Sequence, residues 1–282
     1  MPRLCASMTP PGIPPPKGIR KIRRTSQRFL KECIGIRLAF LVELGQSFWM
    51  KNKTALVTGA GKGLGFEVVK LLSSSGVQVF LTARDLKKAE VAYNSLGDFK
   101  KNIRLVELDV ANPGSVKAAF EKINSEIDSL DILINNAGIN YDTWQKAINA
   151  DIEVECKVTM ETNFYGPWRM IKTFLPLLLK STQGRIVNVS SEAGSIAGLT
   201  GGIPAYATSK AALNALTKTV AGELKTNKIL VNSVCPGWCA TEMGGAGGRS
   251  PVLGAKSILW AAELPDDGPT GGFFRDGKSL NW

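Results

Sequence analysis

From residue 50 onward, short apolar segments alternate with longer stretches whose apolar residues recur at helical spacing. The short segments are mostly β-branched and end in polar or glycine-containing turns, which is typical of buried strands. Strands are predicted at 54–58, 77–83, 103–109, 132–135, 185–190 and 229–235. Helices are predicted near 64–75, 86–96, 114–127, 151–180, 205–226 and 251–263. Asn112 is expected to cap the third helix, and Pro167 to interrupt the fourth.

This alternation predicts an α/β fold: a single Rossmann-type, doubly wound parallel sheet of about seven strands with helices on both faces. Right-handed crossovers bring the carboxyl ends of parallel strands to one edge of such a sheet. The residues that follow the strands are therefore the place to look for chemistry. No internal repeat and no further domain boundary is visible after residue 50.

Residues 1–49 are a basic, proline-rich extension that is predicted to be disordered or not translated, whereas residues 50–282 are predicted to form one domain. They hold a proline cluster and carry nine Lys or Arg against two acids, so they account for +7 of the net charge of +11. Three interpretations stay open: translation starts at Met50, the segment is an organelle transit peptide, or it is an amphipathic surface anchor. Arg37 and Glu43 break its apolar part, so we expect no membrane insertion. The small charge of the remainder gives no support to nucleic-acid binding.

The composition excludes several kinds of catalytic site. The chain has no histidine, so Ser-His-Asp hydrolysis, histidine metal sites and histidine acid–base catalysis are ruled out. Its five cysteines form no C-x-x-C pair, which indicates reduced thiols and a cytoplasmic location, with no metal site expected.

A glycine-rich turn joins the first predicted strand to the first helix. It reads T-G-x-x-x-G-x-G from Thr58 to Gly65. Backbone N–H groups at a helix start attract anions, and glycine lets the backbone approach a pyrophosphate closely. An ordinary glycine turn would look the same, so the motif needs support from elsewhere in the chain.

The second predicted strand ends in Arg84, followed by Asp85. In this fold an acid at the strand end binds the adenosine ribose, whereas a nearby arginine accommodates a 2′-phosphate. Lys62, within the glycine turn, offers a second cation. Together Arg84 and Lys62 predict NADP(H), with NAD(H) less favoured; Asp85 leaves contact with a ribose open.

Tyr206 and Lys210 form a Y-x-x-x-K pair on the sixth predicted helix. Residues four apart share a helix face, and a cation beside a phenol lowers its pKa. Tyr206 is therefore a candidate acid–base group in a chain without histidine. Such pairs also occur by chance in helices, so this motif is weak by itself.

The order of these motifs resembles the classical short-chain dehydrogenase/reductase family, carbonyl-reductase-like branch, over residues 52–282. The glycine turn is followed by N-N-A-G at 135–138, a strand ending at Ser191, Y-x-x-x-K at 206–210 and P-G-x-x-x-T at 236–241. The resemblance implies a catalytic set of Asn163, Ser191, Tyr206 and Lys210, in which Asn163 holds a relay water. It implies that the cofactor is bound by Thr58, Gly59, Gly61, Lys62, Gly63, Leu64, Gly65, Arg84, Asp109, Val110, Asn136, Ala137, Gly138, Tyr206, Lys210, Pro236, Gly237 and Thr241.

The resemblance implies that residues 50–282 form one NAD(P)-binding Rossmann catalytic domain. The implied activity is NADPH-dependent reduction of an aldehyde or ketone to an alcohol, with Tyr206 as general acid. Two alternatives stay open: an alcohol dehydrogenase working in the oxidative direction, and an NAD(P)-binding sensor or scaffold without turnover. A glycine-rich loop at 244–248 is expected to be a mobile lid. Its apolar neighbours suggest a small lipophilic carbonyl or alcohol substrate. Only 14 residues separate Ser191 from Tyr206. Monomeric carbonyl reductases, which this chain resembles, carry a long insertion there. A homodimer or homotetramer built from helices 151–180 and 205–226 is therefore compatible with the sequence.

Overall fold

The computed structural model describes residues 50–143 and 145–282, and the predictions for residues 1–49 lie outside them. The described residues form one eight-stranded sheet in the order β3-β2-β1-β4-β5-β6-β7-β8. Neighbouring strands are parallel except for β7 and β8, which are antiparallel. The strands are β1 (Thr54–Val57), β2 (Gln78–Ala83), β3 (Ile103–Glu107), β4 (Ile132–Asn135), β5 (Arg185–Val189), β6 (Leu230–Val234), β7 (Phe273–Arg275) and β8 (Lys278–Ser279).

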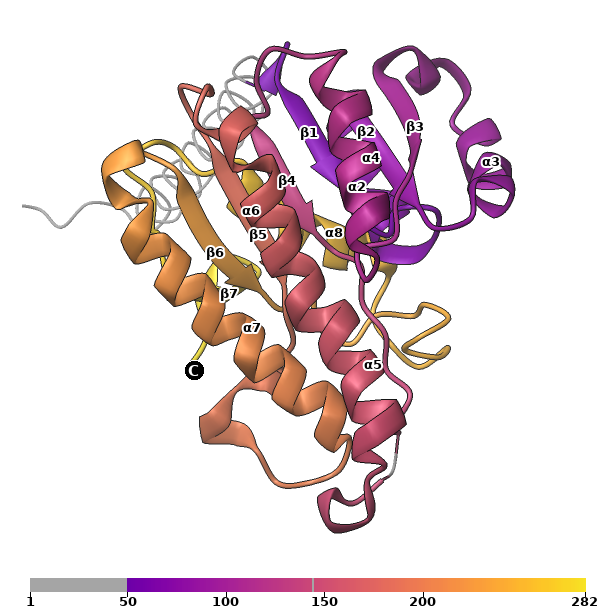
Figure 1. Ribbon diagram of the computed structural model, residues 1–282, viewed down its shortest axis with the longest axis vertical. Helices are drawn as coiled ribbons and strands as arrows, with labels where there is room; N and C mark the ends of the chain where they lie inside the picture. The colour runs from indigo at the N-terminus through magenta and orange to yellow at the C-terminus, as the bar shows by residue number, and fades with distance from the viewer. Residues whose placement is uncertain (1–49, 144) are drawn as a thin grey trace, which may run out of the picture. The chain divides into compact units, whose positions relative to one another are not determined.

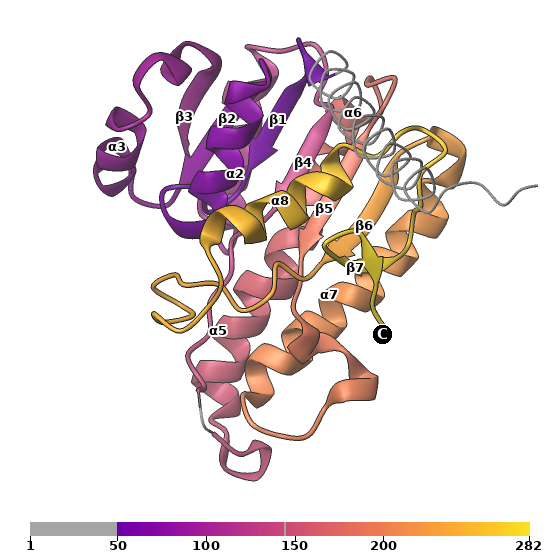
Figure 2. The same cartoon turned by 180° about the vertical axis from the view of Figure 1, so that it is seen from behind.

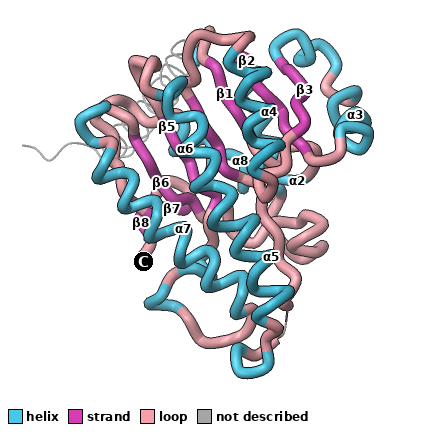
Figure 3. The backbone as a smooth tube through the Cα atoms, viewed as in Figure 1, coloured by secondary structure: helices cyan, strands magenta, loops and turns pink. Residues whose placement is uncertain are grey.

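Helices cover both faces of the sheet, as the alternating pattern predicts. Helices α4, α6 and α7 lie across the face seen in Figure 1, and α2 and α8 lie across the opposite face in Figure 2, with α3 beside the β3 edge. Figure 3 shows the same alternation of helix and strand along the chain. The helices are α2 (Gly63–Ser74), α3 (Leu86–Asn94), α4 (Pro113–Asn124), α5 (Lys157–Met160), α6 (Gly166–Leu178), α7 (Pro204–Glu223) and α8 (Pro251–Ala262).

The main core fills the space between the sheet and helices α4, α6 and α7. Leu56, Leu133, Ile186 and Val231 of four adjacent strands belong to one buried cluster with Phe174 of α6. Both faces of these strands are covered, so their sequences are almost continuously apolar rather than alternating. Burying each large aliphatic or aromatic side chain contributes about 1.5–3 kcal/mol, which makes this layer the chief source of stability.

A row of polar side chains crosses the otherwise apolar centre of the sheet. The Asn135 amide donates to the Asn188 side-chain oxygen at 2.8 Å, and the Asn188 amide donates to the Thr217 hydroxyl at 2.8 Å. The Thr217 hydroxyl in turn lies 2.8 Å from that of Ser233. Asn135, Asn188 and Ser233 occupy matching register positions on β4, β5 and β6, while Thr217 reaches them from α7. All four side chains are buried, so their mutual hydrogen bonds are what makes the row tolerable.

The predicted doubly wound, mainly parallel sheet is confirmed; its eighth strand is the two-residue β8, which the chain adds after turning at Asp276-Gly277. One sequence-based expectation needs correction. Pro167 does not interrupt the long helix: it lies in the first turn of α6, and helical structure continues from Ile152 to Leu178. The irregularity instead takes the form of two π-helical segments, Ile152–Cys156 and Glu161–Tyr165.

The cap predicted for α4 is confirmed. The Asn112 side-chain oxygen accepts hydrogen bonds from the backbone N–H groups of Gly114 and Ser115, at 2.9 and 3.1 Å. Pro113 follows as the first helical residue, where its missing N–H costs nothing.

Candidate active site

The glycine-rich turn and the N-N-A-G segment lie together at the carboxyl ends of β1 and β4. The Thr58 hydroxyl accepts from the backbone N–H groups of Asn136 and Ala137, both at 3.0 Å. The Asn136 amide returns two bonds, to the carbonyls of Thr58 at 2.9 Å and Gly59 at 3.1 Å. These bonds lock two motifs that are nearly eighty residues apart into one surface.

The shape of this surface fits a dinucleotide. Gly59 has φ of +62°, and a Cβ there would lie 2.8 Å from the Ala137 Cα, so only glycine allows the close approach. A Cβ on Gly65 would lie 2.5 Å from the Asn136 amide nitrogen. At the start of α2, Lys62 is the N-cap residue and makes no side-chain capping bond. The first N–H groups of α2 therefore suit the pyrophosphate of a dinucleotide.

The strand-end residues beyond this turn divide into two groups. Arg84 is exposed at the end of β2, and no hydrogen bond or ion pair with another described residue is found for it. Asp85 instead caps α3, because its carboxylate accepts from the Lys88 N–H at 3.1 Å. The Asp109 carboxylate accepts from the Ala111 N–H at 3.0 Å.

Lys62 has a partner that the sequence gave no reason to expect. Its ammonium forms an ion pair with the carboxylate of Glu242, in the loop after β6, and this contact lowers the pKa of Glu242. Both side chains are exposed. A Cβ on Gly63 would also lie 3.6 Å from the Thr241 methyl group. The loop after β6 therefore lies against the glycine-rich turn.

Ser191, Tyr206 and Lys210 lie together where β5 ends and α7 begins. The Ser191 side chain interacts with the Tyr206 phenol and favours its ionised form, and the Ser191 hydroxyl also accepts from the Ala193 N–H at 3.2 Å. The Lys210 ammonium is buried; it donates to the Val189 carbonyl at 2.8 Å and lies 5.6 Å from the centre of the Tyr206 ring. The helical spacing of Tyr206 and Lys210 thus directs both side chains to the end of one strand.

The pKa of Tyr206 differs from the expectation. Burial raises it to about 12, and the interaction with Ser191 only partly offsets this rise. The net shift is therefore upward, and a lowering by Lys210 stays a prediction. Burial also lowers the pKa of Lys210 to about 8, and its ammonium is bound by a backbone carbonyl rather than by the phenol. Tyr206 consequently carries its proton at neutral pH, as a proton donor must.

Asn163 lies in the second π-helical segment, a kind of irregularity that is frequent at functional sites. Its side-chain oxygen accepts from the Ile139 N–H at 2.9 Å, and its amide donates to the Ile139 carbonyl at 2.9 Å and to the Ser209 hydroxyl at 3.0 Å. A Cβ on Gly138 would lie 3.3 Å from that oxygen and 3.5 Å from the Lys210 ammonium. Asn163 thus joins the segment after β4 to α7, and its role with a water stays a prediction.

The loop after β6 is held by several hydrogen bonds. Arg249 donates its N–H to the Trp238 carbonyl at 2.7 Å, and the Trp238 indole donates to the Gly244 carbonyl at 2.6 Å. A Cβ on Gly244 would lie 2.2 Å from the Cys239 carbonyl oxygen, and one on Gly248 2.4 Å from the Cys239 carbonyl carbon. Glycine at these two positions therefore permits close backbone packing. The sequence alone cannot distinguish glycines that serve such packing from glycines of a mobile lid.

Sequence analysis missed Cys235 as a member of this site. Its sulfur accepts from the N–H groups of Glu192 at 3.3 Å and Gly237 at 3.4 Å, and it lies close enough to influence Tyr206 and Lys210 electrostatically. Burial raises the pKa of this thiol, so it is neutral. Its position directly before Pro236, at a predicted strand end, was the available signal.

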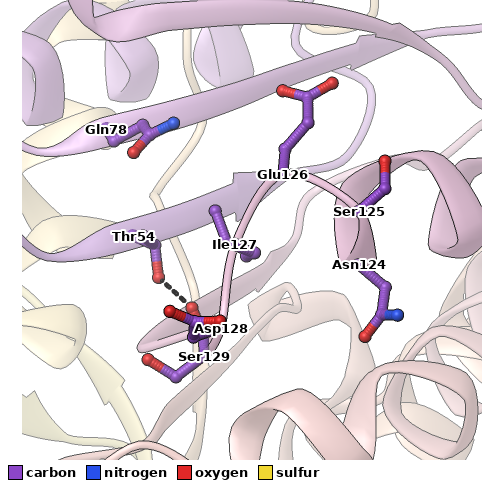
Figure 4. Close-up of a pocket in the computed structure, with 8 residues that line it drawn as sticks. All are labelled: Thr54, Gln78, Asn124, Ser125, Glu126, Ile127, Asp128 and Ser129. Carbon is purple, nitrogen blue, oxygen red and sulfur yellow. Dashed lines mark hydrogen bonds between the residues drawn. The ribbon is translucent and has the colours of Figure 1, made fainter.

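A cavity of about 390 Å³ lies at the opposite edge of the sheet. Thr54 and Gln78, at the amino ends of β1 and β2, line it together with residues 124–129 (Figure 4). The Thr54 hydroxyl donates to the Ser129 carbonyl at 2.7 Å across it. None of the predicted catalytic or cofactor-binding residues lines it, so this cavity is separate from the candidate active site.

Comparison with known proteins agrees with this geometry. The family model described as short chain dehydrogenase matches residues 53–249. The chain belongs to the short-chain dehydrogenase family. This dehydrogenase is 33% identical to carbonyl reductase (NADPH) 1 of Mus musculus over 81% of its length and 98% of the mouse protein. It is 32% identical to salutaridine reductase of Papaver bracteatum over 82% of its length and 96% of the plant protein.

Solved structures support the same placement. The NADPH-bound carbonyl reductase from chicken fatty liver matches with a TM-score of 0.75 and 30% identity, over 82% of this chain and 95% of that one. Carbonyl reductase Sniffer of D. melanogaster matches with a TM-score of 0.74 and 31% identity, over 82% and 100% of the two chains. The protein is an oxidoreductase of the carbonyl-reductase-like branch of its family.

Two further searches bear on what else the dehydrogenase could bind. Among residues 50–143 and 145–282, no group of three or more carboxylate or thiol side chains is arranged to hold a metal ion. Within the same residues, no helix has both the length and the apolar character needed to cross a membrane.

Proposed function

We propose that the protein reduces the carbonyl group of an aldehyde or ketone to an alcohol with NADPH, using Tyr206 as the general acid. The observation that carries this proposal is the placement of the Tyr206 ring 5.6 Å from the buried ammonium of Lys210, with Ser191 interacting with the Tyr206 phenol. A carbonyl oxygen within reach of both hydroxyls would accept two hydrogen bonds. Those bonds would strengthen as negative charge develops on the oxygen.

Proton transfer follows from the protonation states. Because the pKa of Tyr206 is about 12, the phenol is protonated at neutral pH and can donate to the developing alkoxide. Ser191 holds that oxygen, and the Lys210 ammonium beside the ring stabilises the phenolate left behind. NADPH, when bound, supplies the hydride.

NADP(H) as the cofactor is supported by the residues around the glycine turn. Arg84 lies at the end of β2 without a protein partner among the described residues, and Asp85 is engaged in capping α3. A cation suits a 2′-phosphate there, and the acid that would otherwise bind a ribose is occupied. The mouse relative and the chicken liver structure are both named for NADPH.

A small lipophilic substrate is supported by the apolar side chains around the loop after β6. Trp238 is 67% exposed and Met243 51% exposed, and Leu253 at the start of α8 is also exposed.

A cytoplasmic location remains a prediction. A homodimer or homotetramer would cover Val158, Tyr165 and Trp168, which are exposed along the 152–178 helix. Light scattering at micromolar concentration tests this, and a monomer would contradict it.

The deciding experiment is a screen of purified protein against aldehydes, ketones and quinones, following NADPH absorbance. We expect turnover with at least one lipophilic carbonyl compound, and turnover at least about a hundredfold lower when Tyr206 is replaced by Phe. Alcohol oxidation with NADP⁺, run in parallel, tests the oxidative alternative. Tight NADPH binding without turnover of any compound in either direction would favour the sensor or scaffold.

A further inference from the structure

Helix α7, which carries Tyr206 and Lys210, begins in an unusual way. Its N-cap residue Ile203 has a left-handed backbone with φ of +43° and makes no side-chain capping bond. Pro204 follows and has no N–H. The N–H groups of Ala205 and Tyr206 therefore need acceptors from outside the helix.

A buried carboxylate 63 residues away in the sequence supplies both. One Asp142 oxygen accepts from the Ala205 N–H at 2.6 Å, and both oxygens lie within 3.3–3.4 Å of the Tyr206 N–H. Asp142 is only 1% exposed. With the Ala207 N–H bonded to the Ile203 carbonyl, every N–H group at the start of α7 is accounted for.

The other side of Tyr206 is held by the same segment of chain. The Tyr206 carbonyl accepts from the Ser209 hydroxyl at 2.7 Å, a local bond that serines elsewhere in these helices also make. Here, however, Ser209 also accepts from Asn163, whose amide is bonded in both directions to the Ile139 backbone. Ile139 and Asp142 are three residues apart in the loop after β4, so one loop fixes Tyr206 from both ends.

We propose that Asp142 is a positioning residue for carbonyl reduction: its buried carboxylate, held in the loop after β4, sets where the Tyr206 phenol stands relative to Ser191. This rests on the proposed function, in which Tyr206 donates the proton. The same loop includes Gly138, beside Asn163 and Lys210, so the segment expected to line the cofactor is continuous with the one that holds the acid.

The test compares variants of two side chains that each cap the start of a helix: Asp142 at α7 and Asn112 at α4. In Asp142→Ala the start of α7 loses its acceptors, and a shift of about 1 Å in a reacting group can cost a hundredfold in rate. We expect kcat to fall about tenfold to a hundredfold, with KM and the NADPH dissociation constant changed less than about threefold. Asp142→Asn retains one acceptor oxygen for the N–H groups at the start of α7, and asparagine caps helices about as well as aspartate. This variant should therefore keep at least about a third of the parent's kcat.

Asn112→Ala is the matched control, since it removes the two-bond cap of α4. Its melting temperature should fall about as much as that of Asp142→Ala, while its kcat stays within about twofold of the parent. Equal losses of kcat in the two variants, or more than half of the parent's kcat in Asp142→Ala, would overturn the proposal. So would an Asp142→Asn variant as slow as Asp142→Ala.

If Asp142→Ala does not fold, Asp142→Glu takes its place. It keeps the charge but lengthens the side chain, so kcat should fall at least about fivefold with KM unchanged; parent-like kcat would overturn the proposal.

A parent without carbonyl turnover would refute the proposed function instead. In that case a crystal structure of the folded Asp142 variant decides: the Tyr206 ring should move away from Ser191 and Lys210, and an unchanged ring position would overturn the positioning role.

Discussion

Lys62 and Glu242 are separated by 180 residues in the sequence, and their ion pair joins the glycine-rich turn to the loop after β6. Lys62 is expected to bind a 2′-phosphate, and in the structure its ammonium is paired with the Glu242 carboxylate. An exposed ion pair is weak, because water screens it and both side chains lose freedom in forming it. A phosphate can therefore displace Glu242, and Lys62 would exchange one anion for another when NADPH binds.

The first prediction concerns cofactor preference. A bidentate contact between Arg84 and a phosphate is worth about 1.5–3 kcal/mol, so Arg84→Asp should weaken NADPH binding about tenfold to a hundredfold and leave NADH binding nearly unchanged. Glu242→Gln should act oppositely and tighten NADPH binding a few-fold, since Lys62 loses its competing partner. Fluorescence titration with both cofactors measures this. Equal affinity of the parent for NADPH and NADH would contradict the assignment.

The second prediction concerns the general acid. Tyr206→Phe removes one oxygen and keeps the ring, so packing should survive. NADPH should bind with little change, because its predicted contacts lie mainly at the glycine turn, at 135–138 and at Lys210. Turnover should fall about a hundredfold to ten-thousandfold, the usual contribution of a positioned acid. Residual activity above about a tenth of the parent's, with a genuine carbonyl substrate, would move the acid elsewhere.

The third prediction concerns pH. Burial lowers the pKa of Lys210 to about 8, so in the folded, cofactor-free protein its charge is present below that pH and lost above it. Lys210 is expected to hold the nicotinamide ribose as an ammonium, so NADPH affinity should fall as pH rises from 7 to 9.5. Lys210→Met should bind NADPH weakly at every pH in this range. A parent with constant affinity across the range would refute this role.

The fourth prediction concerns residues 1–49. The family match begins at residue 53, and β1 begins at Thr54, shortly after Met50. A chain starting at Met50 should therefore keep the melting temperature and turnover of the full chain. Differential scanning calorimetry and the NADPH assay compare the two proteins. A loss of several degrees or of most of the activity would show that the segment belongs to the folded enzyme.

The sequence predicts this fold well because its signals are local. Each expected strand overlaps an observed one, since buried parallel strands are continuous apolar runs that end at turns. The two-residue β8 is too short to show a pattern, and the π-helical segment at Asn163 shifts the helical phase by a single residue, which apolar spacing does not reveal.

The candidate site is predicted only in part, for a related reason. Tyr206, Lys210 and the glycine turn belong to short motifs, whereas the partners of Lys62 and of the Tyr206 N–H come from distant loops with no motif of their own. The direction of the Tyr206 pKa shift also depends on burial. Burial is a property of the packed structure, and the i, i+4 spacing of Tyr206 and Lys210 says nothing about it.

The polar row through the sheet has a consequence for assembly. Side chains alternate across a strand, so a slip of β5 by one residue would turn Asn188 to the opposite face. The Asn135 amide would then lose its acceptor in apolar surroundings, at a cost of about 1–3 kcal/mol. The Thr217 hydroxyl would lose its bond from Asn188 but keep those with Leu213 and Ser233. Parallel strands pair across long sequence separations, where apolar contacts alone discriminate poorly between registers. The polar row therefore disfavours sheets in which β5 is shifted by one residue relative to its neighbours.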